Sequence, residues 1–193
     1  MADTDPGGNA NGGNSYCTVA RGHLVHAPYH DTEYGFPGKG ERALFELLCL
    51  EIFQAGLSWE LILKKRPTMV TAFDNFDVDT VAAYGDTATR RLLDDAGIIR
   101  NRLKIASIIH NAQVVQGLRA SDGGFVAWLN RHRPLDLQTW VKLFRKTFKF
   151  TGPEVVHEFL MSTGYLGGAH ADDCPVYQTI LKTNPPWLQD QSS

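Results

Sequence analysis

The stretch LCLEIFQAGLSWELILKK, residues 48–65, decides the fold class, because its apolar residues recur with helical spacing and leave almost no polar face. Within the helix predicted over residues 41–55 and closed by Gly56, Glu51 lies on an apolar side. Glu46 lies five positions away, about 140° round the helix, and is the residue expected to face solvent. Four apolar residues share the face of Glu51, at spacings of three, four or seven: Leu44, Leu47, Leu48 and Ala55. The sequence therefore predicts a carboxylate on the buried side of a helix, where it needs a partner.

Apolar segments of helical period, broken by Gly and Pro, predict further helices along the chain. Ser58 can cap a helix that ends before Pro67, and Pro67 suits the first turn of the next helix. No stretch shows convincing alternation of period two, so the predicted fold class is all-α. The predicted helices are residues 41–55, 58–66, 67–75, 79–84, 87–95, 101–118, 125–131, 137–147 and 154–163.

The ends of the chain differ in composition from the middle. Residues 1–15, MADTDPGGNANGGNS, contain no large apolar residue after Met1 and predict a disordered leader. Residues 184–193 predict a loose tail, with Trp187 as a candidate anchor. Between them we expect a single domain over residues 16–183.

The bulk composition is that of an ordinary soluble protein, with 193 residues, 43% hydrophobic and 21% charged. A formal net charge of −2 gives no overall attraction to nucleic acid or to an anionic membrane, so either partner would need a local basic patch. Such clusters are also typical of a solvated face; they are Lys64-Lys65-Arg66, Arg131-His132-Arg133, and Lys142 with Arg145, Lys146 and Lys149. We find no membrane-spanning run and no signal pattern, and expect a cytoplasmic protein associated with the nucleoid and with no membrane.

Residues 92–109, LLDDAGIIRNRLKIASII, join two helical patterns by a tight connection in which Gly97 is available for positive φ. One interpretation is a helix-hairpin-helix element that holds a DNA phosphate through exposed amides and nearby cations. The other interpretation is a plain corner between two helices, with a solvated basic face. The candidate DNA-backbone residues are Gly97, Ile98, Arg100, Arg102 and Lys104.

Two thiols and two imidazoles are split between the ends of the chain. Cys17 and His30 have C-x12-H spacing, and His170 and Cys174 have H-x3-C spacing. Together they would form a complete tetrahedral zinc set, closed to substrate, that ties the terminal segments together. The alternative is unrelated surface histidines and buried cysteines, and competing ligands are available in His23, His26 and His157. A catalytic zinc would require an open position beside a polarising acid.

Aromatic residues flank the helix of Glu51 in sequence. Tyr29 and Trp59 could form a slot for a planar heterocycle beside this buried acceptor, or they could simply be core residues. Gln54, one turn after Glu51, lies on the same face and could share its role. Phe53 is a further candidate neighbour of the slot.

Five motifs, in this order, resemble the 3-methyladenine DNA glycosylase I family of helix-hairpin-helix repair enzymes: YHDTEYG, CLEIFQAGLSWELILKKR, FDNFD, LLDDAGIIRNRLKI and FKFTGP. The resemblance covers about residues 16–177. It implies a monofunctional glycosylase that flips 3-methyladenine out of double-stranded DNA and hydrolyses its N-glycosidic bond, leaving an abasic site. It also implies one structural zinc ion on Cys17, His30, His170 and Cys174.

By matching motif positions, the resemblance implies that Glu51 hydrogen-bonds the purine edge, with Tyr29 and Trp59 packing around the base. A role of Glu51 in orienting the attacking water is a second expectation. The family lacks the catalytic Asp that its helix-hairpin-helix relatives place beyond the hairpin, and no residue here is assigned to it. The chain departs from the family pattern at Tyr34, Phe53, His26 and Gly168-Ala169, all of them outside the Glu, the aromatic pair and the zinc set.

Three functions remain open at this point. The first is the glycosylase, expected to act as a monomer on DNA containing alkylated adenine. The second is a catalytically weak, zinc-stapled DNA-binding protein that senses modified bases, which the substitutions near the pocket allow. The third is a metal-dependent hydrolase, which requires an open zinc site.

Overall fold

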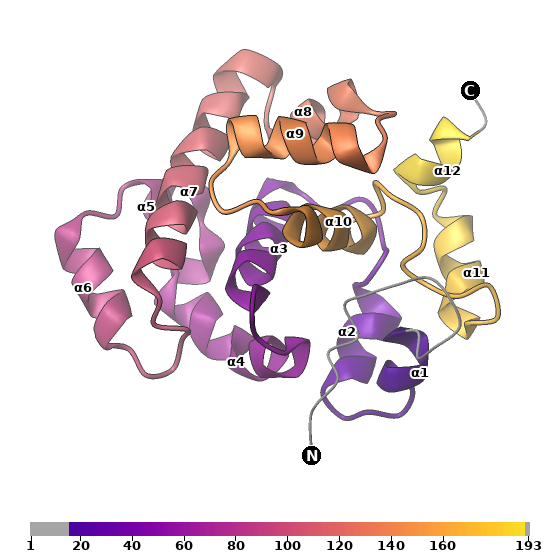
Figure 1. The fold of residues 1–193 in the computed structure, drawn as a ribbon, viewed down its shortest axis with the longest axis horizontal. Coiled ribbons are helices and arrows are strands. Elements are labelled where there is room, and N and C mark those ends of the chain that lie inside the picture. The colour runs from indigo at the N-terminus through magenta and orange to yellow at the C-terminus, as the bar shows by residue number, and fades with distance from the viewer. Residues whose placement is uncertain (1–15, 192–193) are drawn as a thin grey trace.

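Helix α3 (Glu41–Gln54) lies at the centre of the fold, with α10 (Pro153–Ser162) and α7 (Arg102–Asp122) packed against it (Figure 1). The computed structural model describes residues 16–191, and every regular element in that range is helical. The all-α prediction is therefore confirmed for this range. The remaining elements are α1 (Tyr16–Ala20), α2 (His26–Thr32), α4 (Trp59–Ala72), η1 (Asp74–Phe76), α5 (Val78–Ala82), α6 (Asp86–Asp94), α8 (Phe125–His132), α9 (Leu137–Thr147), α11 (Pro175–Lys182) and α12 (Pro186–Asp190).

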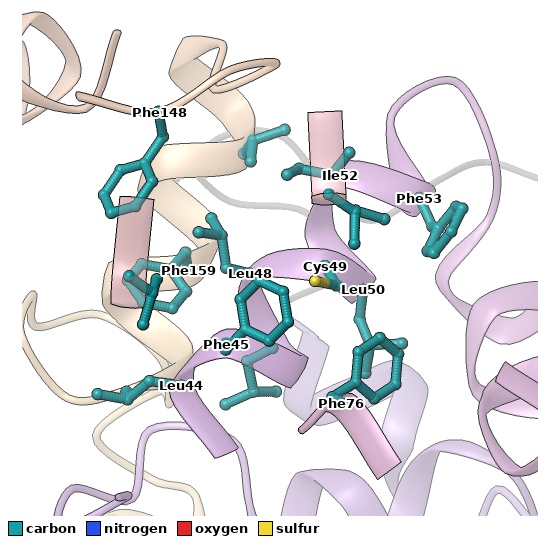
Figure 2. Packing of buried hydrophobic residues seen from close by; sticks show 14 of the residues in the cluster. Leu44, Phe45, Leu48, Cys49, Leu50, Ile52, Phe53, Phe76, Phe148 and Phe159 are labelled. Atoms are coloured by element: carbon teal, nitrogen blue, oxygen red, sulfur yellow. The ribbon is translucent and has the colours of Figure 1, made fainter. Parts of the chain in front are cut away.

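The core forms around α3, in which every residue from Leu44 to Phe53 is buried. Figure 2 shows Phe45, Leu48 and Phe159 grouped on one side of this helix and Phe53 on the other. Burying each large apolar side chain stabilises the fold by about 1.5–3 kcal/mol. Because α3 is covered on all sides, its two acidic residues in this stretch are both forced into the interior.

Glu46 corrects one prediction, because it is buried rather than exposed to solvent. Its Oε1 accepts a hydrogen bond from Nε of Arg66 at 2.8 Å, and the same guanidinium holds Glu33 at 2.7 Å. Helical spacing shows only which residues share a face, and here α4 covers the face that was expected to be free. Glu46 is thus a buried carboxylate with a cationic partner.

Helix α4 corrects a second prediction, since it runs through Pro67 instead of ending before it. The ring of Pro67 removes one backbone hydrogen bond, which costs about 3 kcal/mol in a helix interior. Pro67 itself lies on the exposed side, whereas Ile62, Met69 and Ala72 on the opposite side are buried. We infer that burial of this apolar face outweighs the local cost of the proline.

Four short helices were absent from the prediction: α1, α2, α11 and α12. Each has only five to eight residues, too few to show a helical period. The prediction of a loose tail is wrong for residues 184–191, which include helix α12. Arg133 holds this helix by donating to the Pro186 carbonyl and to Asp190, each at 3.1 Å. Trp187 lies against Gly167, as its candidate role of anchor requires.

The predicted leader, residues 1–15, lies outside the described residues, and the proposed domain boundaries stay a prediction. Among residues 16–191, none of the helices combines the length and the apolar character that crossing a membrane requires. Helices α1 and α2 lie beside α11, although they come from opposite ends of the chain (Figure 1).

Candidate functional site

Glu51 is 4% exposed, and no lysine or arginine among residues 16–191 forms an ion pair with it. Four titratable groups interact electrostatically with Glu51. They are Tyr16 on α1, Tyr29 on α2, Tyr34 just after α2, and Glu158 on α10. Burial, and then the nearby charge of Glu158, raises the pKa of the Glu51 carboxyl well above its usual range. Unlike Glu46, Glu51 therefore has no internal cation to offset its burial.

Tyr29 supplies a second unsatisfied polar group beside Glu51. Its ring centroid lies 5.1 Å from that of Trp59, with the two rings at 63°. Its hydroxyl is buried, and no partner lies within hydrogen-bond distance. The nearby Ser162 hydroxyl donates to the Phe159 carbonyl at 3.0 Å. An unpaired buried hydroxyl costs about 1–3 kcal/mol. An aromatic pair, an orphan hydroxyl and an unpaired carboxylate together can bind a planar ligand that donates hydrogen bonds and carries positive charge.

Tyr16 and Glu158 belong to this site but were missed by sequence reasoning. The Tyr16 ring lies 5.1 Å from that of Tyr34, and its hydroxyl is 3.2 Å from Nδ1 of His26. The Tyr34 hydroxyl donates to Oε2 of Glu158 at 3.1 Å. The position of Tyr16 directly before a candidate zinc ligand was a usable signal. No sequence signal pointed to Glu158, because only the packing of α10 on α3 brings it to the site.

Phe53 corrects a prediction, because it does not face the site. Its side chain is fully buried on the opposite side of α3, with its ring 5.7 Å from the ring of Phe73. Phe53 is therefore a core residue, placed by packing between α3 and the chain that follows α4. Gln54 is half-buried at the end of α3, and its role stays a prediction.

The four predicted zinc ligands are brought together and are all buried, with their ligand atoms within 4.8 Å of one another. Nδ1 of His170 lies 3.7 Å from Sγ of Cys17 and 3.5 Å from Sγ of Cys174. Nε2 of His30 lies 3.8 Å from Sγ of Cys174. Bonds of about 2.3 Å to sulfur and 2.0–2.1 Å to nitrogen at tetrahedral angles require about 3.6 Å between these atoms. The cluster thus fits a tetrahedral zinc ion.

In each of the two histidines, the ring nitrogen that points away from the cluster has a hydrogen-bond acceptor of its own. Nδ1 of His30 lies 2.6 Å from Oδ1 of Asp31, and Nε2 of His170 lies 2.9 Å from the carbonyl oxygen of Tyr34. Each acceptor fixes a proton on the outer nitrogen and leaves the inner nitrogen unprotonated for a metal. The amide of Ala171 also donates to Sγ of Cys17 at 3.4 Å. Four protein donors leave no open position, as expected of a structural site.

The competing histidines form a separate cluster, His23 with His26 and Glu60. Nδ1 of His23 accepts hydrogen bonds from the amides of Val25 and His26, at 3.2 and 3.3 Å, which places its proton on Nε2. Glu60 pairs with Lys64 at 2.6 Å. These three residues form a second cluster, separate from Cys17, His30, His170 and Cys174.

The hairpin corrects the prediction for Gly97 and Ile98. Gly97 is not among the residues with positive φ; glycine is required because a Cβ there would lie 2.9 Å from Oδ1 of Asp95 and 3.3 Å from Cβ of Thr68. Its amide donates to Asp95, and the amide of the buried Ile98 points to the Asp95 carbonyl at 3.4 Å. Asn101 also caps the first amides of α7. The predicted phosphate donors are therefore engaged within the chain.

Lys104 corrects a further prediction, because it is 4% exposed and faces the interior. Its Nζ donates to the carbonyl oxygens of Phe53 and Ala55, at 2.8 and 2.6 Å, at the C-terminal end of α3. These carbonyls lack partners within α3, so Lys104 caps the helix and fixes the start of α7 beside it. Arg100 and Arg102 are exposed at that same end of α7.

The residues of the run Lys64-Lys65-Arg66 likewise have partners within the chain. Lys64 pairs with Glu60, and Lys65 donates to the carbonyls of Ala96 and Gly97, at 3.0 and 3.2 Å. Arg66 holds two carboxylates, as described above. Lys65 thus fixes the hairpin to α4, whereas Lys64 lies on the surface in an ion pair with Glu60.

Comparison with known proteins shows the family. A sequence model of the methyladenine glycosylase family matches residues 20–142. The Escherichia coli DNA-3-methyladenine glycosylase 1 is 34% identical over 172 residues, covering 79% of this chain and 91% of the relative. The Haemophilus influenzae DNA-3-methyladenine glycosylase is 31% identical over 170 residues, covering 78% and 91%. A Staphylococcus aureus 3-methyladenine DNA glycosylase I, solved to show how it recognises 3-methyladenine, superposes with a TM-score of 0.73 at 31% identity, over 83% of this chain and 95% of that chain.

The match runs from α2 through the hairpin into α9 and so includes Tyr29, Glu51 and Trp59, whereas Tyr16 and Glu158 lie outside it. The structural likeness extends beyond it, to most of the chain. The chain therefore belongs to the methyladenine glycosylase family.

Proposed function

We propose that the protein is a monofunctional base-excision glycosylase, acting as a monomer on double-stranded DNA, that releases 3-methyladenine and leaves an abasic site. The observation that carries this proposal is the unpaired, buried Glu51 beside the orphan hydroxyl of Tyr29. The relatives named above are DNA-3-methyladenine glycosylases, which supports the same reaction.

The chemistry follows from the charge of the substrate. A 3-methyladenine nucleotide carries positive charge on the base, so its glycosidic bond is already weak and its pairing is compromised. Flipping it from the duplex therefore costs less than flipping an intact base. Glu51 replaces its lost solvation with a fixed negative charge and accepts from its exocyclic amine, while Tyr29 and Trp59 pack around the ring.

Bond breaking then rests on the leaving group and on the electrostatics of a closed pocket. The positive charge that spreads over the sugar in the transition state lies near Glu51, which stabilises it. Water attacks the anomeric carbon and loses a proton to solvent, the glycosidic electron pair returns to the base, and the base leaves as neutral 3-methyladenine. Glu51 is also the group available to orient that water.

We propose one structural zinc ion on Cys17, His30, His170 and Cys174, supported by the fit of their separations to tetrahedral bond lengths. When bound, the ion would cross-link α1, α2 and the segment before α11, and no step of the reaction passes through it. His170, one of the residues that would hold the ion, also contacts the backbone carbonyl of Tyr34 at 2.9 Å and so fixes the chain at this pocket residue.

Release of free base from methylated duplex DNA tests the proposed function. We expect the wild-type protein to release 3-methyladenine with little 7-methylguanine, measured by chromatography of the soluble bases. Alkali cleavage at the resulting abasic sites gives a second readout of the same event. Protein that binds the DNA tightly but frees no base would replace this function with the sensor of modified bases.

Substitution of the exposed cations at the start of α7 should affect DNA binding, whereas substitution of the buried Lys104 should affect stability. We expect alanine at both Arg100 and Arg102 to weaken DNA binding and to reduce the slope of log affinity against log salt by about one per residue, with stability unchanged. Lys104→Met should instead lower the free energy of unfolding by about 1–2 kcal/mol, because it leaves two carbonyls at the end of α3 without a donor. A reduced salt slope for Lys104→Met, at wild-type stability, would contradict its capping role.

A further inference from the structure

Glu158 lies at the edge of the base pocket, although no sequence motif marks it. It is half-buried on α10, and the Tyr34 hydroxyl donates to its Oε2 at 3.1 Å. The Tyr34 ring in turn lies 5.8 Å from the Tyr29 ring, which contacts Trp59. Tyr34 therefore links Glu158 directly to the aromatic pair that would hold a base.

The charge of Glu158 reaches Glu51. After burial, the negative charge of Glu158 is the second cause that raises the pKa of the Glu51 carboxyl. Two lysines of this region donate to backbone carbonyls: Lys104 at the end of α3, and Lys39 to the carbonyls of Glu33 and Ser162, at 2.8 and 3.2 Å. The other titratable groups facing Glu51 are Tyr16, Tyr29 and Tyr34, none of them cationic.

We propose that Glu158 is a specificity-determining residue: oriented by the Tyr34 hydroxyl, it adds a second negative charge behind Glu51 and selects cationic purines over neutral ones. The inference rests on the proposed function, in that the pocket is taken to receive a purine. It goes beyond that function by assigning the choice of charge state to a residue that does not itself touch the base edge.

The physical reason is that two carboxylates in one poorly solvated region repel each other. A cationic base entering the pocket is attracted by both charges and relieves their repulsion. A neutral base of the same shape gains its packing and hydrogen bonds but leaves the repulsion in place. The second carboxylate therefore strengthens binding of the cation and leaves binding of the neutral isostere nearly unchanged, so the ratio of the two affinities rises.

A matched pair of small molecules measures this ratio. The permanent cation 3,9-dimethyladeninium, whose 9-methyl group replaces the sugar and cannot be hydrolysed, is compared with the uncharged isostere 3-deaza-3,9-dimethyladenine. Dissociation constants are obtained by titration calorimetry. We expect the wild type to prefer the cation, and Glu158→Gln to lose roughly tenfold of that preference at pH 8, because one nearby charge is removed.

The controls separate charge from general damage. Glu158→Asp should keep most of the preference, and Tyr34→Phe should lose part of it by releasing the Glu158 carboxyl. Glu154→Gln removes the same charge from an exposed position in the first turn of the same helix and should match the wild type. A Glu158→Gln protein that folds normally, as judged by circular dichroism, and keeps the wild-type preference would overturn the proposal.

The pH dependence gives a readout that a purely structural role would not change. Cation binding requires ionised Glu51, so affinity should fall as the pH falls through the raised pKa of this carboxyl. Removing the charge of Glu158 lowers the pKa of Glu51. In Glu158→Gln, the fall in cation affinity with decreasing pH should therefore begin at a lower pH. If the affinity for the cation falls at the same pH in Glu158→Gln and in the wild type, the proposal is wrong. Selective cation binding by a wild type that releases no base from DNA would refute the glycosylase function and leave this inference standing.

Discussion

Glu51→Gln should lower the rate of 3-methyladenine release by about 10²–10³-fold, the loss typical of removing one preorganised electrostatic group. The same change should raise the free energy of unfolding by about 1–2 kcal/mol, the gain common when a strained functional residue is replaced. Both effects have one cause: a buried carboxylate without a cation destabilises the folded protein until a cationic base arrives.

The sign of the stability change depends on pH. Because the pKa of Glu51 is raised in the folded protein, the folded state binds this proton more tightly than the unfolded state does. The ionised carboxyl therefore lowers stability above the raised pKa, and this penalty disappears as the pH falls toward the unfolded value. The advantage of Glu51→Gln should be largest at neutral to alkaline pH and vanish in mild acid, as followed by urea unfolding.

Glu46→Gln is the matched control, with the same substitution five residues earlier on the same helix. Glu46 pairs with Arg66, so its loss should lower the free energy of unfolding by about 1–3 kcal/mol and leave base release near the wild-type rate. If the two variants changed stability in the same direction, or if Glu51→Gln kept full activity, the role assigned to Glu51 would be wrong.

Loss of the metal should have the second large effect. The purified protein should contain one zinc per chain, and Cys174→Ala or removal by a strong chelator should lower the free energy of unfolding by about 3–5 kcal/mol or more. The four ligands come from both ends of the chain, so without the ion α1 and α2 lose their attachment to the segment before α11. Hydrogen exchange should rise there first.

At low temperature, the fraction of metal-depleted protein that remains folded should still release base. His23→Asn serves as the control and should leave the metal content unchanged, because His23 belongs to the other histidine cluster. Normal stability of Cys174→Ala together with abolished turnover would instead indicate a catalytic metal.

The sequence by itself determined the features that follow from local spacing. Helical periodicity in residues 48–65 indicated the all-α class and the buried position of Glu51, and the spacings C-x12-H and H-x3-C contained a metal set that the structure brings together. The helical period and the buried side of Glu51 depend on residues within one helix, where the order of residues nearly fixes the geometry of the chain. The two halves of the metal set lie at opposite ends of the chain, and only the fold joins them.

Only the tertiary structure decided which of these charged groups have partners. Arg66 pairs with Glu46 and not with Glu51, Lys104 caps α3 instead of facing DNA, and Phe53 packs into the core. Glu158 reaches the pocket from more than a hundred residues away in sequence. Periodicity indicates which residues share a face, but the electrostatics of that face depend on which helix covers it, and this is set by the packing of the whole domain.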